Sequence, residues 1–510
     1  MRATRFGWIG LLAATAAFGS MAGCSDDETT PAPGTPTPQP TTTSPPPSGP
    51  TAQVRVVHAS PDAPAVDVYV EGQNEPVVKG AKFGDATAFL TVPAGSYNFQ
   101  LRPAGAAATT APVYQTGALE VPAGAKITAI ASGLLASSED ASKFRVLALA
   151  DAFKGAADKA TVRIVHGSAD APTVGIDVGN DDPAAPEVAA LERFKDTGAD
   201  GIQLPADTEL QVGIAAGGAR VTAFTTPKLP AGSELYLIAT GLVGKLPREA
   251  DGFSILAVGP SGAIGFVKQN PTVYALHASP DAPAVDVYAG PAEVIDNLDY
   301  AGLSAPLQLP PGEYTLDFYA ATPGATPKPA SAPAATAKTP ALEPGQRYLA
   351  VATGFLLRGL PANDPKTFRL AAFAEGFDTS DATKAFVRLV HASPDAPAVD
   401  VSAVASGALA EPRPYVNVAF GAASDAKGAG LPPPAGSNLL PIGVAATGTA
   451  GIVATFELPN TVLTPGTRAF AVAAGAFAPQ GNEKTFGLIA VETKAWPWTA
   501  AGPVAPTVAQ

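Results

Sequence analysis

Short apolar runs that alternate with polar residues and end at Gly- or Pro-containing turns occupy most of this 510-residue chain. The run at 54–70, VRVVHASPDAPAVDVYV, alternates with a period of two, which is typical of half-buried β-strands. Between such runs, no apolar stripe keeps the 3.6-residue spacing of a helix over a useful length. The pattern therefore predicts an all-β fold.

This run occurs four times along the chain. It returns as VRIVHGSADAPTVGIDV at 162–178, VYALHASPDAPAVDVYA at 273–289 and VRLVHASPDAPAVDVSA at 387–403. Turns of the Pro-Gly type and a closing apolar strand recur in register with it, so each copy holds about seven short strands. A period of about 110 residues fits a whole domain and is too long for one turn of a solenoid. We therefore predict four tandem immunoglobulin-like or transthyretin-like antiparallel β-sandwich domains. A β-propeller built from the four repeats is the alternative architecture.

The repeats and the segments around them divide the chain into seven parts. These are a lipoprotein signal peptide (1–23), a lipidated cysteine with a disordered Pro/Thr-rich stalk (24–51), β-sandwich repeats 1 to 4 (52–152, 160–260, 271–375 and 384–493) and a Pro/Ala-rich tail (494–510). The linkers between repeats are short, and their lengths predict restricted but real bending between neighbouring domains.

The first 24 residues have the order of an export signal. Arg2 and Arg5 precede an apolar stretch at about 6–18, and small residues then lead to Cys24, the single cysteine of the chain. The apolar stretch is shorter than the ~20 residues that a membrane-spanning helix needs. The segment resembles the bacterial lipobox, in which the cysteine becomes the lipid-modified first residue, although Met21 stands where leucine is usual. We expect an exported protein that is lipid-anchored to the bacterial cell envelope through Cys24, in a membrane and leaflet that stay open. An ordinary signal peptide with an incidental cysteine is the alternative.

Composition narrows the classes of partner. The formal net charge is −13 and only 15% of the residues are charged, so no basic patch supports binding of nucleic acid. A single cysteine excludes a disulfide within the chain, so the domains depend on their cores alone. The expected contacts are the membrane, through the N-terminal lipid only, and an envelope polymer or a surface protein. The oligomeric state stays open.

The repeated motif also contains the candidate site residues. Strand parity puts each histidine on the side of its strand that is apolar in every copy, so the imidazole is expected to point inward and to need polar partners. An aspartate follows each histidine by four residues, and a second follows three of them by nine. The set is His58, Asp62, Asp67, His166, Asp170, His277, Asp281, Asp286, His391, Asp395 and Asp400.

Two interpretations of this set remain open. In the structural one, a His–Asp latch ties the first strand of each domain to the turn that follows it. In the functional one, the same groups bind a ligand or take part in catalysis. One histidine per domain offers too few ligands for a typical divalent site, so we predict no metal and no cofactor.

The string HASPDAPAVDVY, with its period, resembles the bacterial family called domain of unknown function 4397. The resemblance covers about residues 52–493 and implies an exported setting, often a lipoprotein or surface protein. It implies no activity. The second copy departs most from the motif, because Ala169 replaces the motif proline and Gly175 replaces the second aspartate.

Motifs for catalysis are missing from the sequence. It has no nucleophile elbow, no zinc-protease helix and no complete P-loop, so we predict a protein that is not an enzyme. The leading hypothesis is a structural or adhesive envelope protein that displays its repeated domains. An array of carbohydrate- or metal-binding modules is one alternative, in which Trp496 and Trp498 could stack on sugars or serve as a strap on the last domain. A hydrolase that uses a His–Asp pair is the other.

Overall fold

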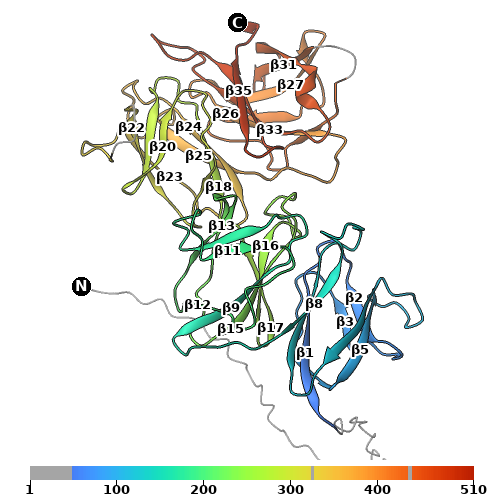
Figure 1. The fold of residues 1–510 in the computed structure, drawn as a ribbon. Helices are drawn as coiled ribbons and strands as arrows, with labels where there is room; N and C mark the ends of the chain where they lie inside the picture. The colour runs from blue at the N-terminus through green and yellow to red at the C-terminus, as the bar shows by residue number, and fades with distance from the viewer. Residues whose placement is uncertain (1–48, 323–326, 435–438, 510) are drawn as a thin grey trace, which may run out of the picture. The chain divides into compact units, whose positions relative to one another are not determined.

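The computed structural model describes residues 49–322, 327–434 and 439–509, and this part of the chain is built almost wholly from β-strands. Each repeat forms two sheets. One contains the strand that ends at the motif histidine, and we call it the motif sheet. The other begins with the strand that follows the motif turn, and we call it the second sheet. Figure 1 shows the two sheets of repeat 1, in blue, with β1 and β8 on one side and β2, β3 and β5 on the other.

Hydrogen bonds set the order of the strands within each sheet. In repeat 1 the motif sheet runs β4 (Leu90–Pro93), β1 (Thr51–His58), β7 (Lys126–Ser132) and β8 (Arg145–Ala150), and the second sheet runs β3 (Val78–Ala81), β2 (Val66–Val70), β5 (Gly95–Pro103) and β6 (Tyr114–Val121). In repeat 2 they are β12 (Ile202–Pro205), β9 (Lys159–His166), β15 (Glu234–Thr240), β16 (Ser254–Gly259) and β17 (Gly262–Lys268), and β11 (Val188–Leu191), β10 (Val174–Val178), β13 (Gln211–Ala216) and β14 (Ala219–Thr225).

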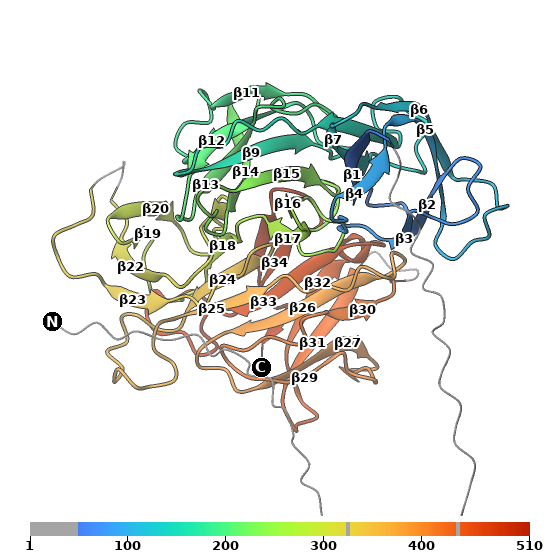
Figure 2. The same cartoon turned by 90° about the horizontal axis from the view of Figure 1, so that it is seen from below.

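The second half of the chain follows the same plan. In repeat 3 the sheets are β21 (Leu307–Gln308), β18 (Thr272–His277), β24 (Arg347–Thr353) and β25 (Arg369–Ala374), and β20 (Ala292–Leu298), β19 (Val285–Ala289), β22 (Thr315–Ala320) and β23 (Ala335–Lys338). In repeat 4 they are β30 (Ala429–Leu431), β26 (Ala385–Ala392), β33 (Arg468–Ala474), β34 (Gly487–Glu492) and β35 (Thr499–Val504), and β28 (Ala408–Leu409), β27 (Val399–Ala405), β31 (Leu439–Ala446), β32 (Ile452–Pro459) and β36 (Val508–Ala509), with β29 (Tyr415–Val418) also paired to β27. Figure 2 shows β30, β26 and β33 of repeat 4 side by side.

The predicted all-β sandwich is confirmed, and the described strands form no closed barrel or propeller. Its description as antiparallel needs one correction. The motif strand of every repeat pairs in parallel with a strand 73 to 82 residues later, in the pairs β1–β7, β9–β15, β18–β24 and β26–β33, while the other named pairs are antiparallel. Alternation of apolar residues is the same for both directions of pairing, so the sequence pattern could not distinguish them.

The motif sheets are buried on both faces because the repeats pack in pairs. A cluster of fully buried side chains joins the motif sheets of repeats 1 and 2, and a second cluster joins those of repeats 3 and 4. The first cluster is Val57, Ala59, Ile130, Val165, Tyr236, Ile238, Leu256 and Val258. Strand parity predicts that this face of the motif strand points away from the core of its own domain. The structure covers it with the neighbouring repeat, so side chains on both sides of the strand are buried.

The linkers inside each pair also lie in these interfaces. Phe153, between repeats 1 and 2, contacts the ring of Tyr236 edge-on at 5.5 Å between centroids. Phe377, between repeats 3 and 4, contacts Phe470 in the same way at 5.1 Å and is 1% exposed. Packing of a linker in an apolar interface restricts motion between the domains on either side of it.

The end of the chain contributes to the fold. Residues 494–510, expected as a tail, supply β35 and β36 at sheet edges of repeat 4. Trp498 is 4% exposed and stacks on Tyr274 of repeat 3 at 4.4 Å, while Trp496 is 47% exposed. Trp498 is thus a strap that packs on repeat 3 as well as on repeat 4.

Helices are nearly absent from the described ranges. A short 3-10 helix, η1 (Asn460–Leu463), precedes β33. Within the residues that the structure describes, no helix has the length and apolar character to span a membrane.

The paired packing makes a testable prediction. Ile238→Ala removes a fully buried side chain from the interface of repeats 1 and 2, and we expect it to lower the free energy of unfolding by about 2–4 kcal/mol. Hydrogen exchange should rise in repeat 1 as well as in repeat 2, since the two share this core. The control Val113→Ala, at a 40% exposed site, should change stability by about 0.5 kcal/mol or less. Faster exchange in repeat 2 alone would contradict the shared core.

Candidate functional site

The lipidation residue predicted from the sequence, Cys24, lies outside the described residues. The other predicted site residues lie at one end of each sandwich, where the motif strand turns into the second sheet.

All four motif histidines are buried, with 1–2% of their surface exposed. Each Nε2 lies 2.8–3.2 Å from the carbonyl oxygen of a proline six residues later in the motif turn. A carbonyl only accepts hydrogen bonds, so Nε2 carries the proton and Nδ1 is the free nitrogen of the neutral ring. In repeats 3 and 4, Nδ1 accepts the amide of the serine two residues on, at 3.3 Å. The histidine thus closes its own turn, with no aspartate in the hydrogen bond.

Burial fixes the charge state of these rings. Desolvation lowers the pKa of His58, His166, His277 and His391 below the usual 6.5, and the bond to the proline carbonyl opposes this only in part. The rings are therefore neutral at pH 7. A neutral, buried ring with its proton held by a carbonyl is poorly placed for acid–base catalysis.

The first motif aspartate fastens the turn to a distant loop. The carboxylate of Asp62 accepts the amides of Leu135 and Ala136 at 2.8 and 2.9 Å. The corresponding loops, each following the parallel neighbour of the motif strand, are held in the same way by Asp170, Asp281 and Asp395. The expected direct pairing of His with Asp is thus replaced by two separate bonds to backbone, because the aspartate faces the loop after the parallel strand.

A serine and a glycine complete this connection, and neither is among the site residues predicted from the sequence. Ser60, Ser168 and Ser279 each donate to the carbonyl of a glycine at 2.6–2.9 Å. In all four repeats this glycine has φ between 77 and 90°, and a Cβ there would lie 2.2–2.5 Å from a carbonyl oxygen. The glycines are Gly133, Gly241, Gly354 and Gly475. The sequence did contain a signal for both residues. A serine follows every motif histidine by two residues, and the glycine directly follows the parallel partner of the motif strand in each repeat.

The second motif aspartate holds a β-bulge in the second sheet. Asp67 accepts the amides of Gly80 and Gly105 at 2.6 and 2.9 Å, and Gly80 has φ of 62°. Asp286 and Asp400 bind the amides of Asn297 and Asn417, which have φ of 50 and 54°. A carboxylate that pairs the amide of such a strained residue stabilises the bulge.

Repeat 2 departs from the motif and keeps the register shift between Val174 and Ile176 without the aspartate, so the aspartate goes with the positive-φ residue opposite the bulge and not with the bulge as such. A Cβ on Gly175 would lie 2.6 Å from the side chain of Pro186, so the proline ring fills the space of the missing carboxylate. The matching strand β11 contains no residue with positive φ. Asp177 lies two positions on and forms an ion pair with Arg220 at 3.5 Å instead.

One group of carboxylates among the described residues has the spacing for a metal ion. Asp286, Glu293 and Asp296 offer oxygens within 4.8 Å of one another. Oxygen ligands of this kind suit calcium or magnesium. However, both oxygens of Asp286 already accept amide hydrogen bonds, from Asn297 and Thr322, and Glu293 accepts the hydroxyl of Tyr288. Two of the three carboxylates are therefore already engaged by the fold.

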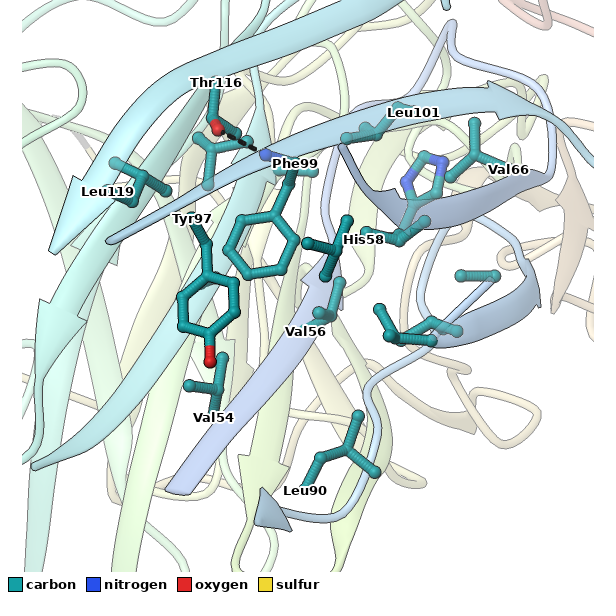
Figure 3. Close-up of a pocket in the computed structure, with 18 of the residues that line it drawn as sticks. Val54, Val56, His58, Val66, Leu90, Tyr97, Phe99, Leu101, Thr116 and Leu119 are labelled. Atoms are coloured by element: carbon teal, nitrogen blue, oxygen red, sulfur yellow. Dashed lines mark hydrogen bonds between the residues drawn. The ribbon is translucent and has the colours of Figure 1, made fainter. Parts of the chain in front are cut away.

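Each sandwich also contains an apolar cavity between its sheets. In repeat 1 the cavity is about 70 Å³ and lies beside His58, Val56 and Phe99 (Figure 3). The cavities of repeats 2, 3 and 4 measure about 60, 30 and 80 Å³. A cavity that binds benzene is about 150 Å³, so these are voids of packing and too small for a substrate.

The role of the second aspartate can be tested in repeat 1. Asp67→Ala leaves two amides unpaired, and we expect a loss of about 2–3 kcal/mol in the free energy of unfolding. Hydrogen exchange should rise first at residues 78–81 and 104–106. The surface variant Asp158→Ala is the control and should leave the urea midpoint unchanged. Equal effects of the two variants would refute the structural role.

The histidines predict a dependence of stability on acid. Their folded pKa values lie below 6.5, so as the pH falls below about 6.5 the unfolded chain takes up protons that the folded chain does not. Stability is then fully present above about pH 6.5 and is lost by up to about 1.4 kcal/mol per pH unit for each histidine. The measurement is the urea midpoint between pH 7.5 and 5.5, above the range where most carboxylates titrate.

A variant separates the histidines from other groups in this experiment. The amide of Gln in His58→Gln can still donate to the carbonyl of Pro64 but does not titrate. The slope of stability against pH should become shallower by about a quarter, since one of four histidines is removed. An unchanged slope would show that His58 does not titrate between the folded and unfolded states.

Comparisons with known proteins give a family and little more. A search of curated proteins finds no match. Among solved structures, the chain is similar to the Bacillus anthracis TIE protein at 10% identity and a TM-score of 0.14, over 80% of this chain. The chain spans 65% of that protein's length. The family model "Domain of unknown function (DUF4397)" matches residues 52–177 and 271–402, just over half of the chain.

Each match starts at an odd-numbered repeat and ends in the motif of the next one, so the two matches coincide with the beginnings of the two structural pairs. With its repeated motif and paired β-sandwiches, the chain belongs to the domain of unknown function 4397 family.

Proposed function

We propose that the protein is an exported, lipid-anchored envelope protein that displays its β-sandwich pairs for structural or adhesive contact and performs no catalysis. The anchor is the lipid predicted on Cys24, and the Pro/Thr-rich stretch up to residue 51 is the spacer that holds the sandwiches off the membrane. The partner is a polymer or a surface protein of the envelope.

The observation that carries this proposal is that the polar side chains of the repeated motif are already engaged in hydrogen bonds that hold the fold together. Its histidine, serine and aspartates bind backbone groups of their own domain, apart from the hydroxyl of Ser393 and the second aspartate, which repeat 2 lacks. A motif repeated for catalysis would leave a nucleophile or base free at a surface. A motif repeated for building produces several copies of one rigid frame, which suits the display of several weak contacts on one chain.

The anchor is tested by changing the cysteine. In a bacterial host given an alkyne-labelled fatty acid, the wild-type chain should incorporate the label and sediment with membranes. Cys24→Ala should lose the label and most of its membrane association, because a lipid is the only anchor proposed. Retention of Cys24→Ala in the membrane fraction, without label, would disprove lipid anchoring. Ser25→Ala is the matched control and should be labelled like the wild type.

A further inference from the structure

A cleft of about 540 Å³ lies where the motif turn of repeat 3 meets a loop of repeat 4. Small-molecule sites in proteins typically measure 300–1,000 Å³. The cleft is thus of ligand size, in contrast to the 30–80 Å³ voids inside the sandwiches. Beside it, the backbone amide of Lys484 donates to the carbonyl of Pro280 at 2.9 Å, which joins the two repeats and fixes the width of the opening.

The walls combine polar groups with apolar surface. Asp299, Asn482 and Lys484 are exposed at the cleft, and their side chains offer both donors and acceptors. Leu357, which is 67% exposed, and the ring of Tyr300 supply apolar surface beside them. Such a mixture suits a ligand that has hydroxyl groups on its edges and C–H groups on its faces.

The hydroxyl of Tyr300 is left without a partner. It is shielded from water and forms no hydrogen bond with any residue that the structure describes, and burial raises its pKa to about 12. An unpaired buried hydroxyl is unfavourable, and a ligand hydroxyl that reaches it after a small movement of the ring would satisfy it.

Two carboxylates and one ammonium group line the cleft. The carboxylate of Asp281 accepts the amides of Leu356, Leu357 and Arg358. The side chains of Asp299 and Lys484 add one charge of each sign. The lining therefore has a small net negative charge, which disfavours an anionic ligand, and the chain's net charge of −13 further opposes an acidic polymer.

Asp299 and Tyr300 form a pair of neighbouring residues whose chemistry differs among the repeats, although the backbone around the pair is the same. In all four copies, the residue that follows the pair donates its amide to the carbonyl of the motif histidine. The pairs are Lys82–Phe83, Glu192–Arg193, Asp299–Tyr300 and Ala419–Phe420. In repeat 2, the guanidinium of Arg193 donates to the carbonyls of Ala171 and Ala141, so its side chain fills the equivalent position. Only repeat 3 combines a carboxylate with a phenol.

We propose that the cleft between repeats 3 and 4 binds a short stretch of a neutral polysaccharide. Ring hydroxyls pair with Asp299, Asn482 and Lys484, and the C–H face of a sugar packs on Leu357 and Tyr300. The inference rests on the proposed function and deepens it, because it names neutral glycan as the envelope partner and one cleft as the contact.

The test offers maltotriose, cellotriose and chitotriose separately to the purified full-length chain. Saturation-transfer NMR identifies contact and calorimetry gives the affinity. At least one sugar should bind saturably. The double variant Asp299→Ala/Asn482→Ala should bind it at least about 10-fold more weakly, since two hydrogen-bonding side chains are lost. The matched exposed pair Asp158→Ala/Asn74→Ala, in repeats 2 and 1, should bind like the wild type.

Tyr300→Phe gives a finer readout. Phenylalanine stands at this position in repeats 1 and 4, so the fold is expected to accept it. Affinity should fall by about 2- to 10-fold with an unchanged melting temperature if the hydroxyl pairs with the sugar. An unchanged affinity in the double variant places any sugar elsewhere and overturns the proposal. The absence of saturable binding by all three sugars also overturns the proposal. So does tighter binding of a lysine-rich peptide that is offered to the chain in the same assay.

Failure of this proposal is distinguishable from failure of the proposed function. Sugar binding is measured on purified protein and does not depend on Cys24. Lipid labelling is measured in cells and does not depend on the cleft. A chain that is labelled but binds none of the sugars overturns the inference alone, and a chain that binds a sugar but is never labelled overturns the anchor alone.

Discussion

The parallel pairing of each motif strand with a strand 73 to 82 residues later is the constraint on which the rest of the structure depends. Two parallel strands cannot be joined by a tight turn, so their shared end must be secured by other contacts. The motif supplies these contacts. Asp62 binds the loop after β7, Ser60 binds the glycine at its start, and His58 closes the turn after β1. Three short side chains thus hold together segments that are more than 70 residues apart in the sequence.

The same fastening explains why the motif resembles an active site in sequence. Histidine, serine and aspartate within five residues are the usual components of hydrolytic catalysis. In this fold each of them is bound to a backbone amide or carbonyl, apart from the hydroxyl of Ser393, and the histidine is neutral and buried. Carboxylates and imidazoles are effective at pairing the backbone groups that a turn leaves unpaired, because their bonds are strong and their side chains are short. In each of the four repeats, the motif side chains thus pair backbone groups of turns and loops, as capping residues do.

The sequence predicted the fold class and the copies well, because alternation and repetition are local signals. Strand parity also placed His58 correctly on the inner face of its strand. The partners could not be predicted, since the amides of Leu135 and Ala136 are backbone groups 73 and 74 residues away from Asp62 and have no signature of their own. The pairing of repeats was missed for another reason. An apolar outer face at Val57 and Val165 is compatible with one sandwich core or with an interface, and parity alone does not distinguish them.

The same position of the motif strand makes different contacts in the two interfaces, so the two pairs do not offer their partners the same surface. Between repeats 1 and 2, Arg55 is 2% exposed and donates to the carbonyl of Gly259 at 2.6 Å, with the carboxylate of Asp151 nearby at 3.7 Å. In repeat 3 the equivalent residue is Tyr274, which stacks on Trp498. Asp151 belongs to repeat 1 itself, so repeat 2 supplies the carbonyl of Gly259 to the buried guanidinium. Repeat 1 set against another repeat would lose this acceptor. A buried donor left without its acceptor costs about 1–3 kcal/mol, so this contact favours repeat 2 as the partner of repeat 1.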